Sequence, residues 1–92
     1  MEYTIQLTHK AEEQLQEWSK SGEDKSEKKI GELFEELRDH PEEGTGQTER
    51  LKGDLTGYWS RRIDTKSRIV YKIDDADAKV TVISLLGLYD DK

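Results

Sequence analysis

The spacing of apolar residues changes once along this chain, near Pro41, and that change limits the fold more than any other feature. Before Pro41, apolar residues recur at the three- and four-residue spacing of amphipathic helices. They are Ala11, Leu15 and Trp18 in a first predicted helix, and Ile30, Leu33, Phe34 and Leu37 in a second. From Gly44 onward this spacing disappears, and the pattern predicts strands separated by turns.

The ends of both helices have recognisable signals. Thr8 offers an N-cap for the first helix, and residues 21–23 (Ser-Gly-Glu) break it. Asp24 and Glu27 resemble a capping box at the start of the second helix, and Pro41 ends that helix. The sequence therefore predicts two helices joined by a short break.

Strands are predicted on both sides of the helices. Tyr3, Ile5 and Leu7 alternate with polar residues, as in a short strand with one buried face. The later strands are predicted at 58–64, 68–74 and 79–86, with turns at 64–67 and 74–77. Because these links are short, the three strands should pair as an antiparallel meander. The predicted fold class is α+β: a short N-terminal strand, a two-helix hairpin and an antiparallel β-meander, with the helices on one face of the sheet. Its 92 residues suit a single domain, residues 1–92.

The composition excludes several classes of protein. The chain has no cysteine, so disulfide scaffolds and thiolate metal sites are excluded, and His9 and His40 lack a metal-ligand spacing. We therefore expect no metal and no other cofactor. No apolar run approaches the roughly 18 residues of a membrane span, and the N-terminus lacks signal-peptide features. A cytoplasmic protein without a membrane partner is expected.

The charge is distributed unevenly along the chain. The formal net charge is −6, yet residues 50–72 hold 7 Lys and Arg against 2 Asp and Glu, while residues 1–49 hold 6 against 14. Screening over about 8 to 10 Å lets a local basic patch act nearly alone. This basic block is thus predicted to bind a phosphate backbone despite the acidic total.

Two consecutive arginines within the block cannot have the same surroundings. On the strand predicted at 58–64, the pleat directs Arg61 and Arg62 to opposite faces of the sheet. One should reach the open, phosphate-accessible face, and the other should lie at a sheet edge or pair with an acidic helix residue. The alternation alone leaves open which arginine takes which place.

Three segments together carry a family resemblance. GTGQTERLK at 44–52, LTGYWSRRI at 55–63 and RIVY at 68–71 resemble the YoeB/Txe-type toxins of the RelE/ParE superfamily, the toxins of bacterial type II toxin-antitoxin modules. The match extends over nearly the whole chain, and it implies a RelE-like fold. It also implies a ribosome-dependent endoribonuclease, or mRNA interferase, that cleaves messenger RNA in the ribosomal A site without a metal. The partners it implies are a YefM-like antitoxin, the ribosome with its mRNA, and a second copy of the chain, since homodimers occur in this branch.

The resemblance also implies roles for individual residues. Glu49 matches the general base that takes the proton from the 2′-hydroxyl. Arg68 matches the arginine that stabilises charge on the phosphoryl oxygens, and Tyr89 matches the aromatic residue that positions the nucleotide. The residues assigned to RNA binding are Lys52, Arg61 and Arg62.

One position departs from the family pattern. Family members end in a His-Tyr pair whose histidine is the general acid, whereas this chain has Leu88-Tyr89. Leucine cannot donate a proton, and a positioned acid contributes about 10² to 10⁴-fold in rate. The sequence therefore predicts a weak nuclease, unless another group or the ribosome supplies the proton. Either the leucine is natural, or it was introduced so that a toxic protein could be expressed.

Two other functions fit the same residues. A non-catalytic RelE-fold module would bind an antitoxin or the ribosome without cleavage, and Leu88 suits that role. A generic acidic α+β interaction domain would have no RNA partner. Three observations separate these functions. Cleavage of ribosome-bound message supports the endoribonuclease, and antitoxin binding without cleavage supports the non-catalytic module. Absence of both supports the generic interaction domain.

Overall fold

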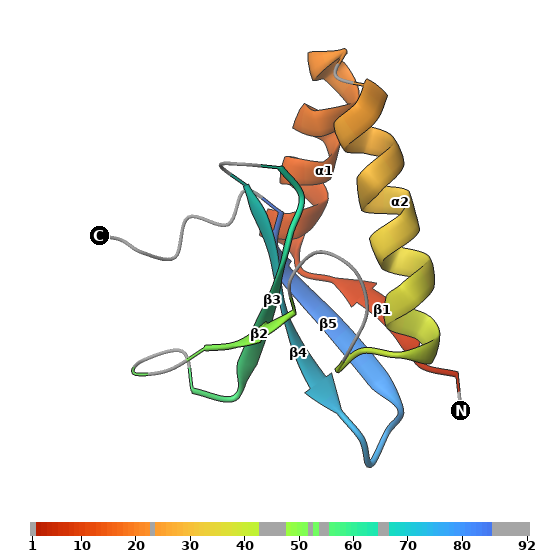
Figure 1. Ribbon diagram of the computed structural model, residues 1–92, viewed down its shortest axis with the longest axis vertical. Helices are drawn as coiled ribbons and strands as arrows, with labels where there is room; N and C mark the ends of the chain where they lie inside the picture. Colours follow the sequence, from red (N-terminus) through yellow and green to blue (C-terminus); the bar gives the residue numbers. More distant parts are fainter. Residues whose placement is uncertain are drawn as a thin grey trace.

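The computed structural model describes residues 2–22, 24–42, 48–51, 53, 56–64 and 67–85, and within these ranges two helices pack on a five-stranded sheet (Figure 1). The elements are β1 (Thr4–Leu7), α1 (His9–Ser21), α2 (Asp24–Asp39), β2 (Glu49–Arg50), β3 (Tyr58–Arg62), β4 (Arg68–Asp74) and β5 (Lys79–Ser84). The strands lie in the order β1-β5-β4-β3-β2. The predicted α+β class and the predicted order of its elements are confirmed.

Local signals set the ends of the helices. The Thr8 hydroxyl accepts a hydrogen bond from the Ala11 N–H at 3.1 Å, which satisfies one of the unpaired amides of the first turn of α1. Gly22 ends α1 in the left-handed region, at φ 77°, where a residue with a side chain would be strained. Asp24 begins α2, and α2 ends at Asp39, just before Pro41. The predicted Thr8 cap, the break at Gly22 and the helix end before Pro41 are confirmed, whereas the capping box of Asp24 and Glu27 stays a prediction.

The sheet is mixed. β1 pairs with β5 in parallel, whereas β2 with β3, β3 with β4 and β4 with β5 are antiparallel. The predicted meander is thus confirmed, although β3 and β5 end earlier than expected, at Arg62 and Ser84. β2 was not among the predicted strands. A strand of two residues shows no alternation that a sequence pattern could reveal.

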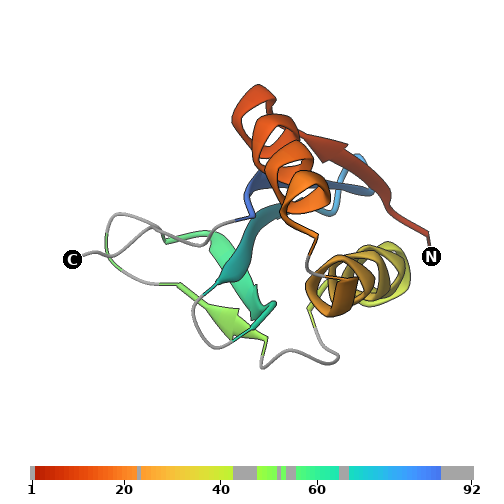
Figure 2. The same ribbon diagram turned by 90° about the horizontal axis from the view of Figure 1, so that it is seen from above.

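The core lies between the helices and one face of the sheet. Its buried residues are Ala11, Trp18, Ile30, Leu33, Leu37, Ile63, Ile69, Tyr71, Val80, Val82 and Leu85. Trp59 is half-buried and packs against this cluster, so both tryptophans belong to the core. Seen from above, α1 and α2 lie toward the β1 side of the sheet, and β2 lies at the opposite edge (Figure 2). The β2–β3 part of the sheet therefore projects beyond the helices.

Candidate functional site

The face of the sheet opposite the core gathers polar and charged side chains. The register places Glu49 of β2 opposite Ser60 of β3, Ser60 opposite Val70 of β4, and Arg62 opposite Arg68. Directly opposed residues share a face, and alternate residues along a strand do so too. Glu49, Ser60, Arg62 and Arg68 therefore lie on one surface, which we call the site face.

Arg68 lies between two of its neighbours on the site face. Its Nη2 is 3.7 Å from Oε1 of Glu49, and its Nη1 donates a hydrogen bond to Oγ of Ser60 at 3.1 Å. The Arg68 side chain is 19% exposed, whereas that of Glu49 is 56% exposed. The structure thus brings together the carboxylate and the guanidinium that the sequence pointed to, with the carboxylate open to solvent.

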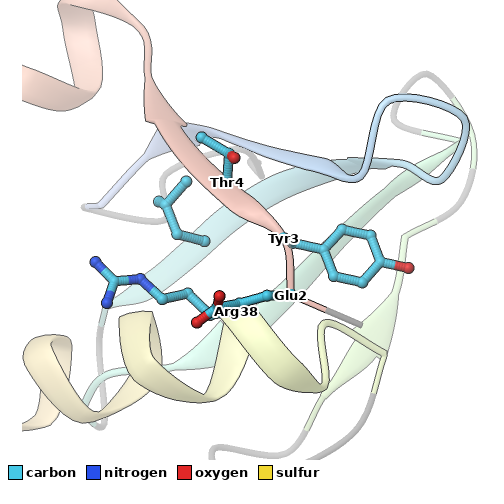
Figure 3. A pocket seen from close by; sticks show the side chains of 5 residues that line it. Glu2, Tyr3, Thr4 and Arg38 are labelled. Carbon is cyan, nitrogen blue, oxygen red and sulfur yellow. The ribbon is translucent and has the colours of Figure 1, made fainter.

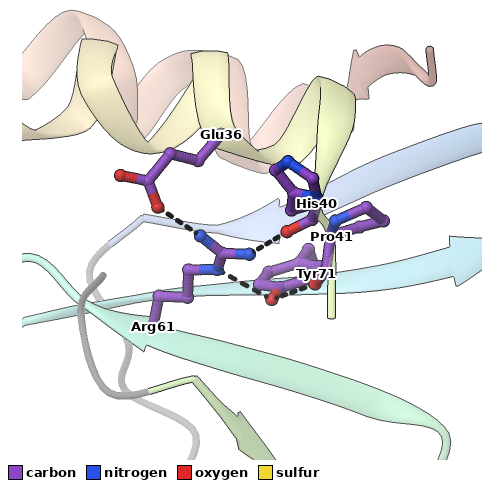
Figure 4. Close-up of polar contacts among 5 residues, drawn as sticks. All are labelled: Glu36, His40, Pro41, Arg61 and Tyr71. Carbon is purple, nitrogen blue, oxygen red and sulfur yellow. Dashed lines mark hydrogen bonds and ion pairs between the residues drawn. The ribbon is translucent and has the colours of Figure 1, made fainter. Parts of the chain in front are cut away.

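Arg61 points the other way, into the protein. Its side chain is fully buried, and Nη1 forms an ion pair with Oε1 of Glu36 at 2.9 Å. Nε donates to the Tyr71 hydroxyl at 3.1 Å, Nη2 donates to the carbonyl of His40, and the Tyr71 hydroxyl donates to the carbonyl of Pro41 at 2.7 Å (Figure 4). Arg61 is therefore the arginine that pairs with a helix glutamate. Its assignment to RNA binding is wrong, because a buried, fully engaged guanidinium cannot reach a phosphate.

Tyr71 has an altered acidity in this buried cluster. Burial raises its pKa above the usual 10.0, because ionisation would place a negative charge where water is largely excluded. The hydrogen bond and the positive charge of Arg61 lower the pKa, but the effect of burial prevails. Tyr71 therefore stays protonated at neutral pH and donates its hydrogen to Pro41.

Two other arginines of the basic block reach solvent. Arg62 is exposed on the site face. Arg50 is exposed on the opposite face of β2, and its guanidinium carbon lies 5.3 Å from the centre of the Trp59 ring. This cation–π contact was not predicted, because Arg50 and Trp59 become neighbours only through the pairing of β2 with β3.

Three predicted site residues, Lys52, Leu88 and Tyr89, lie outside the described residues. Both backbone polar groups of Leu85, the last described residue, form hydrogen bonds with side chains of α1. Its N–H donates to Oε1 of Gln14 at 2.7 Å, and its carbonyl accepts from Nε1 of Trp18 at 3.0 Å. These contacts hold the end of the described chain against α1.

A shallow depression lies at the other edge of the sheet, where β1 meets the last turn of α2 (Figure 3). Its lining residues are Glu2, Tyr3, Thr4, Ile5 and Arg38. The Tyr3 N–H donates to the carbonyl of Arg38 at 2.7 Å, and the Tyr3 hydroxyl donates to Asp75 at 2.6 Å. Because β1 and β2 are at opposite edges, this depression is not part of the site face.

Two further kinds of site find no support in the described part of the chain. Among its residues, no group of three or more histidine, aspartate and glutamate side chains could hold a metal ion. None of its helices is long and apolar enough to cross a membrane.

The sequence from β1 to the C-terminal segment matches a family of known proteins. A model of the YoeB-like toxins of bacterial type II toxin-antitoxin systems matches residues 7–89. The chain belongs to this family. It is 44% identical over 71 residues to the toxin YoeB of Streptomyces coelicolor, an alignment that covers 77% of this chain and 83% of that protein.

Solved structures of related proteins have the same fold. The YoeB/ParE toxin from Agrobacterium tumefaciens superimposes with a TM-score of 0.85 at 30% identity, covering 94% of this chain and 99% of that one. YoeB of Staphylococcus aureus has been solved as a dimer and in a heterotetrameric complex with YefM, with TM-scores of 0.79 and 0.77. Both are 34% identical and cover 97% of this chain and all of theirs. The fold alone extends to the archaeal RelE-RelB complex of Pyrococcus horikoshii, at 18% identity and a TM-score of 0.75.

Proposed function

We propose that this chain is a toxin that cleaves messenger RNA on the ribosome, with Glu49 and Arg68 at the reacting phosphate. The observation that supports this most directly is the 3.7 Å separation of Glu49 Oε1 and Arg68 Nη2 on the site face. A general base and a charge-stabilising cation must both lie within a few ångströms of one phosphate. These two side chains meet that requirement.

The proposed reaction is an attack within the RNA strand. Glu49 accepts the proton of a 2′-hydroxyl, the 2′-oxygen forms a bond to the adjacent phosphorus, and the bond from phosphorus to the 5′-oxygen breaks. Arg68 stabilises the charge that builds up on the phosphoryl oxygens. Arg62, exposed on the same face, binds the RNA backbone, and Lys52 and Tyr89 take the roles that the family resemblance implies.

Leu88 limits the rate of the proposed reaction. The departing 5′-oxygen needs a proton, and the family's histidine is replaced by a side chain that has none to give. We therefore expect slow cleavage, in which water or a ribosomal group protonates the leaving oxygen.

The proposed partners follow from the same function. Since YoeB of Staphylococcus aureus forms a complex with YefM and also a dimer, we propose a YefM-like antitoxin and a homodimer for this chain. Messenger RNA in the ribosomal A site is the proposed substrate. The cytoplasm is where that substrate occurs.

Cleavage of a single message on programmed ribosomes tests the proposal. The cleavage rate of the Leu88→His variant is the reference, because that variant carries the general acid. The rates of Glu49→Gln and Arg68→Ala, each made in the Leu88→His chain, are compared with it. Loss of the base or of the cation should slow cleavage at least about 10²-fold, because both act mainly in the transition state. Arg38→Ala is the matched control, since Arg38 lies on α2 and pairs with Glu35. Cleavage by the Glu49→Gln variant at the reference rate contradicts the assignment.

A second function is favoured by one observation, the leucine at position 88. A non-catalytic module would keep the fold and the basic surface and bind the antitoxin or the ribosome. Binding of either partner without cleavage by the chain or by its Leu88→His variant supports this alternative.

A further inference from the structure

We infer that Ser60 is a positioning residue, whose hydroxyl holds the Arg68 guanidinium beside Glu49. Its consequence for catalysis rests on the proposed function, whereas the contact itself does not.

The surroundings of Ser60 are unusual for a serine. Its side chain is fully buried, although it lies on the face of the sheet opposite the core. A buried hydroxyl is costly unless it forms a hydrogen bond. Here Oγ accepts from Nη1 of Arg68 at 3.1 Å, a bond strengthened by the charge of its donor.

The strand register explains why a small polar residue is needed at this position. Ser60 stands directly between Glu49 on one side and Val70 on the other. Arg68 of β4 pairs with Arg62, which lies two residues beyond Ser60 on β3, so Arg68 is the diagonal neighbour of Ser60. β3 separates Arg68 from β2, the strand that carries Glu49. The Arg68 side chain must therefore pass over Ser60 to reach Glu49. A large side chain at position 60 would occupy that path, and an apolar one would offer no acceptor.

The bond to Ser60 also limits how closely Arg68 approaches Glu49. Nη1 of Arg68 is bonded to the neutral hydroxyl of Ser60. Nη2 lies 3.7 Å from Oε1 of Glu49, which is longer than a hydrogen bond. In a bidentate pair, two guanidinium nitrogens would both donate to the carboxylate. With Nη1 bonded to Ser60, the guanidinium lies beside the carboxylate without forming a bidentate pair with it.

Nitrogen NMR of the Arg68 guanidinium tests the contact without any nuclease assay. In Ser60→Ala, we expect the Nη signals of Arg68 to shift and to exchange faster, because rotation about the Nε–Cζ bond loses its restraint. Ser84→Ala is the matched control, since Ser84 pairs with Val70 from the β5 side and its hydroxyl donates to Gln14. Arg68 signals unchanged in Ser60→Ala overturn the inference.

Cleavage by the Leu88→His reference chain then tests the consequence for catalysis. Ser60→Ala should lower the single-turnover rate about tenfold at unchanged ribosome affinity, because a displaced guanidinium harms only the transition state. Ser60→Cys keeps the size of the side chain but is a weak acceptor, so we expect it to behave like Ser60→Ala. If Ser60→Cys instead cleaves at the reference rate, Ser60 acts through packing alone and the inference fails. Absence of cleavage in the reference chain itself sinks the proposed function, and the NMR result still decides whether Ser60 holds Arg68.

Discussion

Arg61 and Arg62 are neighbours in sequence with opposite surroundings in the structure. The pleat of β3 turns the first toward α2, where Glu36 neutralises it, and the second toward solvent. Alternation predicted this difference but not its direction. The direction depends on Glu36 and the His40 carbonyl, which are 25 and 21 residues away in sequence and become partners only after α2 packs on the sheet.

At the scale of single residues, the site has both predicted and unpredicted members. Glu49 and Arg68 were proposed from the family resemblance, and the structure brings them together. Ser60 was not proposed, because a serine in a strand is common, and only its burial and its hydrogen bond with Arg68 distinguish it.

Leu88→His is expected to restore the missing general acid. If that acid is the only defect, cleavage of ribosome-bound message should rise by about 10² to 10⁴-fold, because the imidazole protonates the leaving 5′-oxygen in the transition state. Ribosome affinity should stay nearly constant, since the histidine acts after binding. Single-turnover cleavage and ribosome binding are measured on the same preparations. An unchanged rate in a folded variant that still binds its antitoxin means that the site lacks more than its acid.

At the scale of elements, local signals were predictable and long-range pairings were not. The Thr8 cap and the Gly22 break depend on residues within a few positions of one another, so the sequence contains the whole signal. The parallel pairing of β1 with β5 joins residues about 75 positions apart, and nothing in either strand specifies the other. The same holds for the two-residue strand β2, which becomes a strand because β3 offers it an edge.

Arg61 joins α2 to the sheet, and its loss should destabilise the protein. In Arg61→Met we expect the free energy of unfolding to fall by about 3 kcal/mol, because Glu36, Tyr71 and the His40 carbonyl each lose a partner. Arg62→Met is the matched control and should change the free energy of unfolding by less than about 0.5 kcal/mol, since Arg62 is exposed. Urea unfolding measures both.

The partner of Arg61 on α2 provides a second comparison. If Glu36 is the main partner, Arg61→Met should cost less in a chain that already carries Glu36→Gln. Equal costs of Arg61→Met in the two backgrounds would show that the ion pair contributes nothing to stability.

Tyr71 should make the stability depend on pH above about 10. Its pKa is raised in the folded protein, so between the unfolded value of 10.0 and the folded value the native state holds a proton that the unfolded state has lost. The stability contributed by Tyr71 is therefore complete below pH 10 and is lost as pH rises through the folded pKa. We expect Tyr71→Phe to be less stable than the parent chain at pH 8, and this difference to shrink above pH 10. Urea unfolding of both chains from pH 8 to 11 measures it, and a difference that stays constant contradicts the raised pKa.

At the scale of the whole molecule, the exposed acidic side chains are concentrated on the helices, although the helices also carry exposed lysines and Arg38. Exposed glutamates crowd the two helices, at Glu12, Glu13, Glu17, Glu32 and Glu35. Arg62 and Arg68 lie on the sheet face opposite the core that those helices cover. On that face Arg62 is exposed and Arg68 is partly exposed beside Glu49, while the acidic helix residues lie across the sheet, where salt screens their charges in part. This arrangement accommodates a polyanionic partner on a chain whose net charge is −6.

Under the proposed function, the exposed position of Arg62 on the site face predicts how ribosome binding should respond to salt. Affinity should fall as salt rises, because bound cations release counterions from the phosphates. Arg62→Ala should weaken binding roughly tenfold for all message sequences alike and reduce the slope of log affinity against log salt by about 0.7 to 1, the value for one lost phosphate contact. Arg38→Ala is the matched control: this arginine is 49% exposed, but it lies on α2 beside Glu35, so neither affinity nor slope should change. Equilibrium binding to programmed ribosomes at several salt concentrations measures both quantities. If Arg62→Ala and Arg38→Ala have the same slope as the parent chain, the site face does not contact the phosphate backbone.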